Sequence, residues 1–175
     1  MKKLLVLVDI QNDFVDGALG TEEAQAIIPN VVEKIRNWSG DVLCTRDTHR
    51  SNYLETSEGK NLPIMHCIEG TSGHMINDKV MSAVIESELK YDILDKYTFG
   101  SVILPDIIRL DGYDYIELVG LCTDICVVSN AMILKANFPE ISIAVDANCC
   151  AGVTPETHKA ALTTMKMCQI DIIGE

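Results

Sequence analysis

The amino-acid sequence predicts an α/β protein in which helices cover both faces of a mostly parallel sheet. Short apolar runs alternate along the chain with stretches of helical periodicity, the pattern of a parallel sheet with crossover helices. The first run, 4–8, is continuously apolar, as expected of a strand buried on both faces. Because 175 residues suffice for one sizeable core, we expect residues 1–175 to form a single domain.

The individual elements follow from hydrophobic spacing and from proline and glycine positions. The predicted strands are 4–8, 41–45, 91–94, 115–120, 141–145 and 171–173. The predicted helices are 22–38, 79–89, 105–110, 123–137 and 155–168. Residues 48–78 lack a regular pattern and are long enough to predict a functional loop.

Composition excludes several classes of partner. The net charge is −12 and the 14 Lys and Arg are scattered, which argues against binding to nucleic acid or anionic membranes. The N-terminal apolar run stops at Asp9 without a cleavage site, and no stretch approaches the roughly 20 residues that span a bilayer. Seven cysteines without a Cys-x-x-Cys pair favour reduced thiols and a cytoplasmic location.

Polar residues follow the predicted strands at the positions where each strand ends. Asp9 ends the first strand, and Lys96 follows the strand at 91–94. Cys126 lies just beyond the strand at 115–120, in the first turn of the next helix. Since sites of open α/β folds lie at the carboxyl ends of the strands, we expect these side chains to meet at one edge.

Acid, cation and thiol together suit nucleophilic attack on an amide or ester. Helix N–H groups around Cys126 are expected to lower its thiol pKa. Taken singly, Cys126 could be a structural core residue, Asp9 a turn residue and Lys96 a surface lysine. Cys122 and Cys126 could also be two metal ligands at helical spacing, although no second cysteine pair is near in the sequence.

A second group of residues indicates a metal site. Asp47, His49 and His66 offer one carboxylate and two imidazoles, which suits a divalent metal with open water positions. The alternative is that these are ordinary surface histidines in a loop.

Four sequence blocks identify a resemblance that covers nearly the whole chain. They are Val-Asp-Ile-Gln-Asn-Asp-Phe at 8–14, Thr-Arg-Asp-Thr-His at 45–49, Pro-Ile-Met-His-Cys-Ile-Glu-Gly-Thr at 63–71 and Gly-Leu-Cys-Thr-Asp-Ile-Cys-Val at 120–127. In order and spacing the chain resembles the isochorismatase-like cysteine hydrolases, whose best-known members are nicotinamidases. The resemblance implies a Rossmann-like three-layer αβα fold with a six-stranded parallel sheet.

The resemblance also implies roles for residues at the sheet edge. It implies a catalytic triad of Asp9, Lys96 and Cys126. It implies a cis peptide between Leu121 and Cys122, so that the N–H groups of Cys122 and Cys126 form an oxyanion hole. It further implies that the group Asp47, His49 and His66 binds zinc or a similar cation, with no organic cofactor, in a homo-oligomer such as a dimer or tetramer.

One departure bears on the substrate. Nicotinamidases usually carry a tryptophan three residues before the last metal-binding histidine, where this chain has Pro63. Phe14, Tyr97 and Phe99 remain as aromatic walls for a ring. We therefore expect hydrolysis of nicotinamide, with a metal-independent amidase for a carbamoyl or ureido substrate as the alternative. Isochorismatase activity is not expected, because those enzymes generally lack the nucleophilic cysteine.

Two readings from other classes stay open on the sequence alone. The chain could be a non-catalytic binding protein on this scaffold, or a redox or thiol-carrier protein that uses its seven cysteines. Alkylation of Cys126 at neutral pH would distinguish the first of these readings from a hydrolase.

Overall fold

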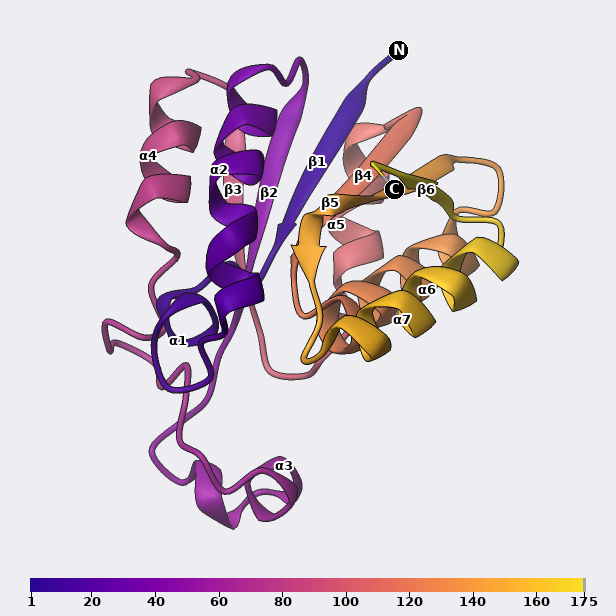
Figure 1. Ribbon diagram of the computed structural model, residues 1–175. Coiled ribbons are helices and arrows are strands. Elements are labelled where there is room, and N and C mark those ends of the chain that lie inside the picture. Colours follow the sequence, from indigo (N-terminus) through magenta and orange to yellow (C-terminus); the bar gives the residue numbers. More distant parts are fainter. Residues whose placement is uncertain (175) are drawn as a thin grey trace.

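The computed structural model describes residues 1–174, the side chain of Leu110 excepted. Its strands form one sheet in the order β3-β2-β1-β4-β5-β6, with every neighbouring pair parallel (Figure 1). The strands are β1 (Lys3–Val8), β2 (Asp41–Asp47), β3 (Tyr91–Lys96), β4 (Tyr115–Leu121), β5 (Ser142–Ala151) and β6 (Asp171–Ile173). The predicted six-stranded parallel sheet is therefore confirmed.

Helices cover both faces of the sheet. Figure 1 shows α2 and α4 on one side and α5, α6 and α7 on the other. The helices are α1 (Asn12–Val15), α2 (Glu22–Arg36), α3 (Ser57–Asn61), α4 (Asp78–Glu86), α5 (Leu104–Asp111), α6 (Val128–Asn137) and α7 (Pro155–Met167). Two short segments have other geometries, a 3₁₀-helix η1 (Tyr53–Glu55) and a π-helix η2 (Thr123–Val127). The three-layer αβα arrangement is thus confirmed.

The centre of the sheet is fully buried, which explains the continuous apolar run at the N-terminus. Residues 4–8 of β1 are each at most 2% exposed, because helices pack on both faces of the strand.

No helix within the described residues is long and apolar enough to cross a bilayer. All seven cysteines carry free thiols.

Three predicted elements differ from the observed ones. The single helix predicted at 123–137 is the π-helix η2 followed by α6. Strand β5 continues to Ala151, since the register of the β4–β5 ladder shifts between Leu118 and Gly120 and pairing then resumes. The irregular segment 48–78 contains η1 and α3, has an internal bridge between His49 and Ile68, and is tied to the body by an isolated bridge between Gln11 and Ile76.

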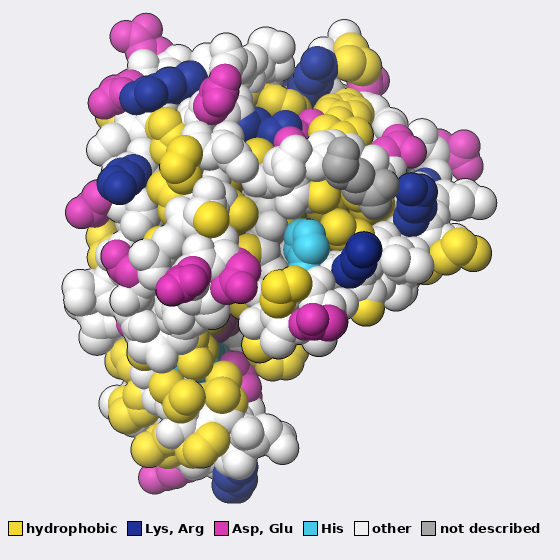
Figure 2. Space-filling view, viewed as in Figure 1, with side chains coloured by type: hydrophobic (Ala, Val, Ile, Leu, Met, Phe, Trp, Pro, Cys, Tyr) yellow, Lys and Arg dark blue, Asp and Glu magenta, His cyan; other side chains and the backbone are white. Residues whose placement is uncertain are grey.

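Part of this irregular segment projects from the body as a lobe. Figure 1 shows η1 and α3 standing clear of the two helical layers. Figure 2 shows hydrophobic side chains gathered on this projecting part. Leu54, Ile64 and Met65 are 48%, 42% and 44% exposed. Exposed apolar side chains in one place are typical of an interaction surface.

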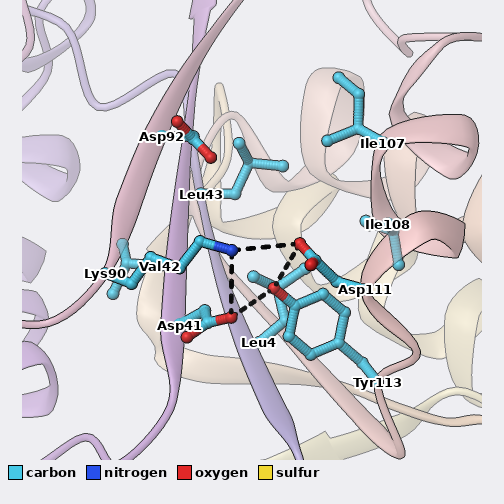
Figure 3. A pocket seen from close by; sticks show the side chains of 10 residues that line it. All are labelled: Leu4, Asp41, Val42, Leu43, Lys90, Asp92, Ile107, Ile108, Asp111 and Tyr113. Carbon is cyan, nitrogen blue, oxygen red and sulfur yellow. Dashed lines mark hydrogen bonds and ion pairs between the residues drawn. The ribbon is translucent and has the colours of Figure 1, made fainter.

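A small cavity lies at the amino-terminal edge of the sheet. It lies beside the start of β2 and is ringed by Asp41, Lys90, Asp111 and Tyr113 (Figure 3). The Tyr113 hydroxyl donates to Asp41 at 2.7 Å, and Lys90 Nζ lies 3.4 Å from Asp111 Oδ2. With a volume of about 20 Å³ the cavity has room for about one water molecule and is too small for an organic substrate.

Gly120 lies where β4 pairs with the end of β1 and leaves no room for a side chain. Its φ is +128°, and a Cβ would lie 2.1 Å from the Val8 carbonyl oxygen. Replacing Gly120 by alanine should therefore lower the free energy of unfolding by about 3 kcal/mol or more, through steric overlap and backbone strain. Urea unfolding followed by circular dichroism measures the loss.

Gly112→Ala is the matched control for this prediction. Gly112 also has a positive φ, +66°, but nothing lies within 4 Å of the position a Cβ would take. We expect a loss of only about 1–2 kcal/mol there, from backbone conformation alone. Equal losses for the two variants would show that close strand contact does not constrain Gly120.

Candidate active site

Three predicted residues meet at the carboxyl edge of the sheet. Lys96, the last residue of β3, places Nζ 2.6 Å from Asp9 Oδ2 and 3.5 Å from Cys126 Sγ. Asp9 follows β1, and Cys126 lies in the π-helix after β4. The structure thus brings the acid, the cation and the thiol into one cluster, with Lys96 between the other two.

The backbone and a buried hydroxyl hold Asp9 in place. Asp9 is fully buried and adopts a positive φ of +49°, which turns the chain away from the strand direction. The Thr45 hydroxyl donates to Asp9 Oδ1 at 2.6 Å. The second carboxylate oxygen, Oδ2, therefore remains for Lys96 and the thiol.

Burial and charge set the protonation of this cluster. Burial raises the pKa of Asp9, and Lys96 opposes the rise. Burial alone would lower the pKa of Lys96, but the Asp9 charge raises it above its ordinary value. The lysine is therefore cationic at neutral pH, while Asp9 is poised to exchange a proton.

The sequence predicted that the pKa of the Cys126 thiol is lowered, and this prediction is wrong. Burial and then the Asp9 charge raise the thiol pKa well above its ordinary value, and Lys96 offsets this only in part. The thiol lies in a π-helical turn at the base of a cavity, where desolvation exceeds any stabilisation by backbone N–H groups. Cys126 is therefore a protonated thiol that needs a base, and Asp9 is beside it.

The peptide bond between Leu121 and Cys122 is cis, as the resemblance implied. The Cys122 carbonyl then accepts hydrogen bonds from the N–H groups of Ile125 and Val127, at 3.1 and 3.0 Å. These two hydrogen bonds join the π-helical turn that carries Cys126 to the residue that follows β4.

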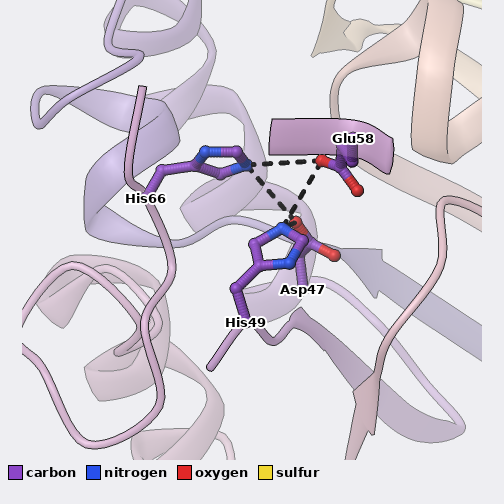
Figure 4. A group of neighbouring side chains, drawn as sticks. All are labelled: Asp47, His49, Glu58 and His66. Atoms are coloured by element: carbon purple, nitrogen blue, oxygen red, sulfur yellow. Dashed lines mark ion pairs between the residues drawn. The ribbon is translucent and has the colours of Figure 1, made fainter. Parts of the chain in front are cut away.

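The predicted metal-binding residues form a second cluster, joined by one residue that the sequence did not predict. Asp47, His49, Glu58 and His66 each offer one ligand atom, and these atoms all lie within 4.8 Å of one another (Figure 4). Glu58 Oε1 is 3.5 Å from His49 Nε2 and 3.7 Å from His66 Nε2. Two imidazoles and two carboxylates suit a divalent metal ion.

Hydrogen bonds from neighbouring groups orient His66 and Asp47, as is usual for residues that bind a metal ion. His66 Nδ1 lies 2.8 Å from the Ile64 carbonyl oxygen. A carbonyl can only accept, so Nδ1 carries the proton and Nε2 presents its lone pair to the cluster. Gln11 holds the backbone of Asp47 from both sides, accepting from its N–H at 2.7 Å and donating to its carbonyl at 2.8 Å.

The cluster attracts positive charge. Burial alone would lower the pKa of His49, but Asp47 and Glu58 raise it to about 9. His49 Nε2 is buried 2.9 Å from Asp47 Oδ2, yet no hydrogen bond of suitable geometry reaches this nitrogen from the described residues. The donor set, its charge and this unpartnered nitrogen all fit a divalent cation.

Asp47 joins the two clusters. Its Oδ2 faces the histidines, at 2.9 Å from His49 Nε2 and 3.7 Å from His66 Nε2. Its Oδ1 lies 3.4 Å from Lys96 Nζ. The candidate metal centre and the thiol cluster therefore share one buried carboxylate.

A cavity of about 720 Å³ opens onto both clusters. Cys122, Cys126, Asp47, Glu58 and His66 reach its wall. The rest of the lining is mostly apolar and includes Phe14, Leu19, Leu62, Tyr97, Phe99, Leu121, Ile125 and Val153. Pockets of about 300–1,000 Å³ accommodate small organic ligands, so the cavity is a candidate substrate site.

The aromatic residues predicted for substrate contact all lie on this cavity. Phe14 packs against His66 with ring centroids 5.5 Å apart, and Tyr97 and Phe99 also line the cavity. Pro63, at the position of the usual tryptophan, is exposed and does not line the cavity within the described residues. The neighbouring Leu62 lines the cavity in its place.

Two residues of the site were not singled out from the sequence. Glu58 lies in α3, eight residues before His66, in a segment with no clear periodicity. Its one local signal is Thr56, a helix N-cap whose side chain accepts from the Gly59 N–H. That signal predicts a short helix but no ligand. Nothing in the sequence marks Gln11 as the support of a residue 36 positions away.

The chain is similar to known proteins over nearly its whole length. The isochorismatase domain model matches residues 3–174. A nicotinamidase/pyrazinamidase of Mycobacterium tuberculosis is 24% identical over 184 residues, covering 98% of each chain.

Solved structures are similar as well. A nicotinamidase/pyrazinamidase of Bacillus subtilis has a TM-score of 0.87 and 25% identity, covering 99% of this chain and 100% of that one. A pyrazinamidase of Pyrococcus horikoshii, solved in complex with zinc, has a TM-score of 0.79 and 24% identity, with both chains fully covered.

Proposed function

The chain belongs to the isochorismatase family, and from that premise we propose that it is a cysteine hydrolase that releases ammonia from a small carboxamide, nicotinamide first of all. Two proteins that match 98% and 99% of this chain are nicotinamidase/pyrazinamidases, one of Mycobacterium tuberculosis and one of Bacillus subtilis. The observation that carries the proposal is the position of Lys96, 2.6 Å from Asp9 and 3.5 Å from Cys126, beside a cavity that the thiol reaches.

In the proposed acylation step Asp9 is first a base and then an acid. It takes the thiol proton as Cys126 attacks the amide carbonyl and forms the C–S bond. N–H groups of Cys122 and Cys126 stabilise the oxyanion, at roughly 3–4 kcal/mol for each donor. The C–N bond then breaks, and Asp9 gives its proton to the leaving nitrogen, so that ammonia departs and a thioester remains.

Deacylation repeats the proton transfers with water. Asp9 takes a proton from the attacking water, and the C–S bond breaks. The same proton returns to the sulfur, so that the carboxylic acid leaves and the thiol is restored. Lys96 stays cationic throughout and keeps the Asp9 carboxylate and the sulfur close together. The raised pKa of Asp9 suits a group that must hold a proton in two of the steps.

Ammonia release from a panel of amides tests this function. Nicotinamide and pyrazinamide should be hydrolysed, and carbamoyl amines and ureido acids should not. The reverse order would place the chain among amidases for carbamoyl or ureido substrates, which the absence of a tryptophan at Pro63 would then explain. No hydrolysis, together with an unreactive Cys126, would favour a non-catalytic binding protein.

We further propose that Asp47, His49, Glu58 and His66 hold one divalent cation, zinc being the candidate that fits two imidazoles and the zinc-bound relative. When bound, the cation would orient the substrate through a ring nitrogen or a carboxylate. The sulfur nucleophile comes from Cys126. Removing the cation with a chelator should therefore raise KM at least about tenfold and leave alkylation of Cys126 by iodoacetamide unchanged.

Glu58→Gln and Glu55→Gln form a matched pair for the metal proposal. Both glutamates lie on the projecting lobe, but only Glu58 faces the histidines, while Glu55 is exposed. In zinc titrations the Glu58 variant should bind at least about tenfold more weakly, and the Glu55 variant should match the parent. Equal affinity in all three proteins would exclude Glu58 as a ligand.

We also propose that the protein is a cytoplasmic homo-oligomer, a dimer or tetramer. The exposed Leu54, Ile64 and Met65 on the projecting lobe support self-association. Sedimentation should show a species heavier than the 19.3 kDa chain. A 19.3 kDa species alone, at all concentrations, would contradict it.

A further inference from the structure

Asn130 is a buried side chain that connects the nucleophile's helix to the cavity wall. It lies in α6, is fully buried, and is four residues beyond Cys126. We propose that Asn130 is a positioning residue, whose carboxamide sets the distance between Cys126 and the aromatic wall formed by Tyr97 and Phe99. The inference rests on the proposed amide hydrolysis and deepens it, because it names what holds the substrate wall in place.

The carboxamide makes three hydrogen bonds in two directions. Its Nδ2 donates to the Cys126 carbonyl at 2.8 Å and to the Phe99 carbonyl at 3.2 Å. Its Oδ1 accepts from the Ser101 N–H at 2.9 Å. Two donors and one acceptor are used at once, so neither a carboxylate nor an apolar side chain can replace this group.

The wall segment 97–101 depends on its backbone for its position. Tyr97 and Phe99 line the cavity but are 57% and 44% exposed, so little side-chain packing holds them. Gly100 lies flush against α6, where a Cβ would come within 2.6 Å of Ile133 Cδ1.

Lys96 also takes part in holding the wall segment. Its Nζ donates to the Thr98 carbonyl at 3.1 Å. The same lysine lies 2.6 Å from Asp9 Oδ2. The wall is therefore tied to the reacting groups at two points, through Lys96 at one end and through Asn130 at the other.

The geometry predicts which kinetic constant Asn130 controls. Loss of its bonds to Phe99 and Ser101 frees the wall segment and leaves the contacts of Asp9, Lys96 and Cys126 intact. Substrate would then bind less well, while the bound fraction would react as before. A change in KM without a change in kcat is the signature of this role.

Asn130→Ser separates the hydrogen bond to the Cys126 carbonyl from the two hydrogen bonds to the wall segment. A serine here should still bond the carbonyl four residues earlier, as the neighbouring Ser129 does with Ile125 at 2.6 Å. It is too short to reach the wall segment. Asn137→Ala is the control on the same helix, because its Nδ2 makes the same bond to the Ile133 carbonyl, at 2.9 Å, and no hydrogen bond among the described residues joins its side chain to the segment 97–101.

Nicotinamide kinetics and hydrogen exchange by mass spectrometry test the proposal together. For Asn130→Ser we expect KM to rise about tenfold with kcat within about twofold, an unchanged rate of Cys126 alkylation, and faster deuterium uptake in peptides covering 97–103. Asn137→Ala should match the parent in all four. An unchanged KM, a fall in kcat alone, or unchanged exchange in 97–103 would overturn the proposal.

Failure of the proposed function has a different signature. If the parent protein hydrolyses no carboxamide, the amidase proposal fails, and exchange in 97–103 still decides whether Asn130 holds the wall. If the parent is active and the serine variant has parental kinetics and exchange, Asn130 alone is wrongly assigned. Asn130→Ala removes all three hydrogen bonds and should raise KM at least as much as the serine variant does.

Discussion

Replacing Cys126 by alanine should lower amide hydrolysis by at least about 10⁴-fold, because the change removes the thiol that is proposed to form the thioester. The change removes one buried sulfur from a turn whose backbone is closed by hydrogen bonds to the Cys122 carbonyl, so the fold should persist. Ammonia release measures the activity, and far-ultraviolet circular dichroism checks the fold.

Two further alanine variants sharpen this result. Cys168→Ala makes the same chemical change in the partly exposed residue that follows α7 and should retain activity. Cys122→Ala keeps the backbone N–H assigned to the oxyanion and removes a second thiol from the cavity. If the Cys122 variant is inactive and the Cys126 variant is active, the nucleophile is wrongly assigned.

Asp9→Asn should lower turnover by about 10²–10⁴-fold and at the same time make Cys126 easier to alkylate. Asn cannot protonate the leaving nitrogen or accept the proton of water, so both chemical steps suffer. The Asp9 charge is one of the causes that raise the Cys126 pKa, whereas Lys96 lowers it. Without that negative charge the thiol pKa falls, and the thiolate appears at lower pH.

The pH profile of iodoacetamide alkylation therefore tests the role of Asp9 apart from the fold. In the Asp9→Asn variant the profile should move to lower pH than in the parent. Asp16→Asn, the same change at an exposed carboxylate, should leave both turnover and profile in place. Loss of turnover with an unmoved alkylation profile would mean that Asp9 supports the structure and does not share a proton with the thiol.

Local pattern was enough to predict the fold and the edge on which the site lies. The apolar runs and helical stretches predicted a parallel α/β sheet, and all six predicted strands are present. The carboxyl ends of parallel strands meet at one edge, so residues that follow strands were expected to meet. Asp9, Lys96 and Cys126 do so. Asp47 and His49, which follow the predicted strand 41–45, lie at the same edge, and His66 joins them from the irregular segment 48–78.

Features that depend on packing between distant segments did not follow from the sequence. Glu58 completes the metal cluster only because the projecting lobe folds back over His66. Gln11 supports Asp47 across 36 residues, and Asn130 reaches the wall segment across 29 and 31 residues. Contacts between residues far apart in the sequence cannot be predicted from hydrophobic periodicity, because periodicity reports only the local structure around each residue.

The sequence by itself determined which chemical groups stand at the strand ends, since strand length and hydrophobic alternation are local properties. Only the tertiary structure decided their protonation. Cys126 lies at a helix start, which alone would favour a thiolate, yet its burial beside Asp9 raises the thiol pKa. Desolvation depends on every segment that packs around a group. The need for a base, and hence the role of Asp9, therefore follows from the assembled fold.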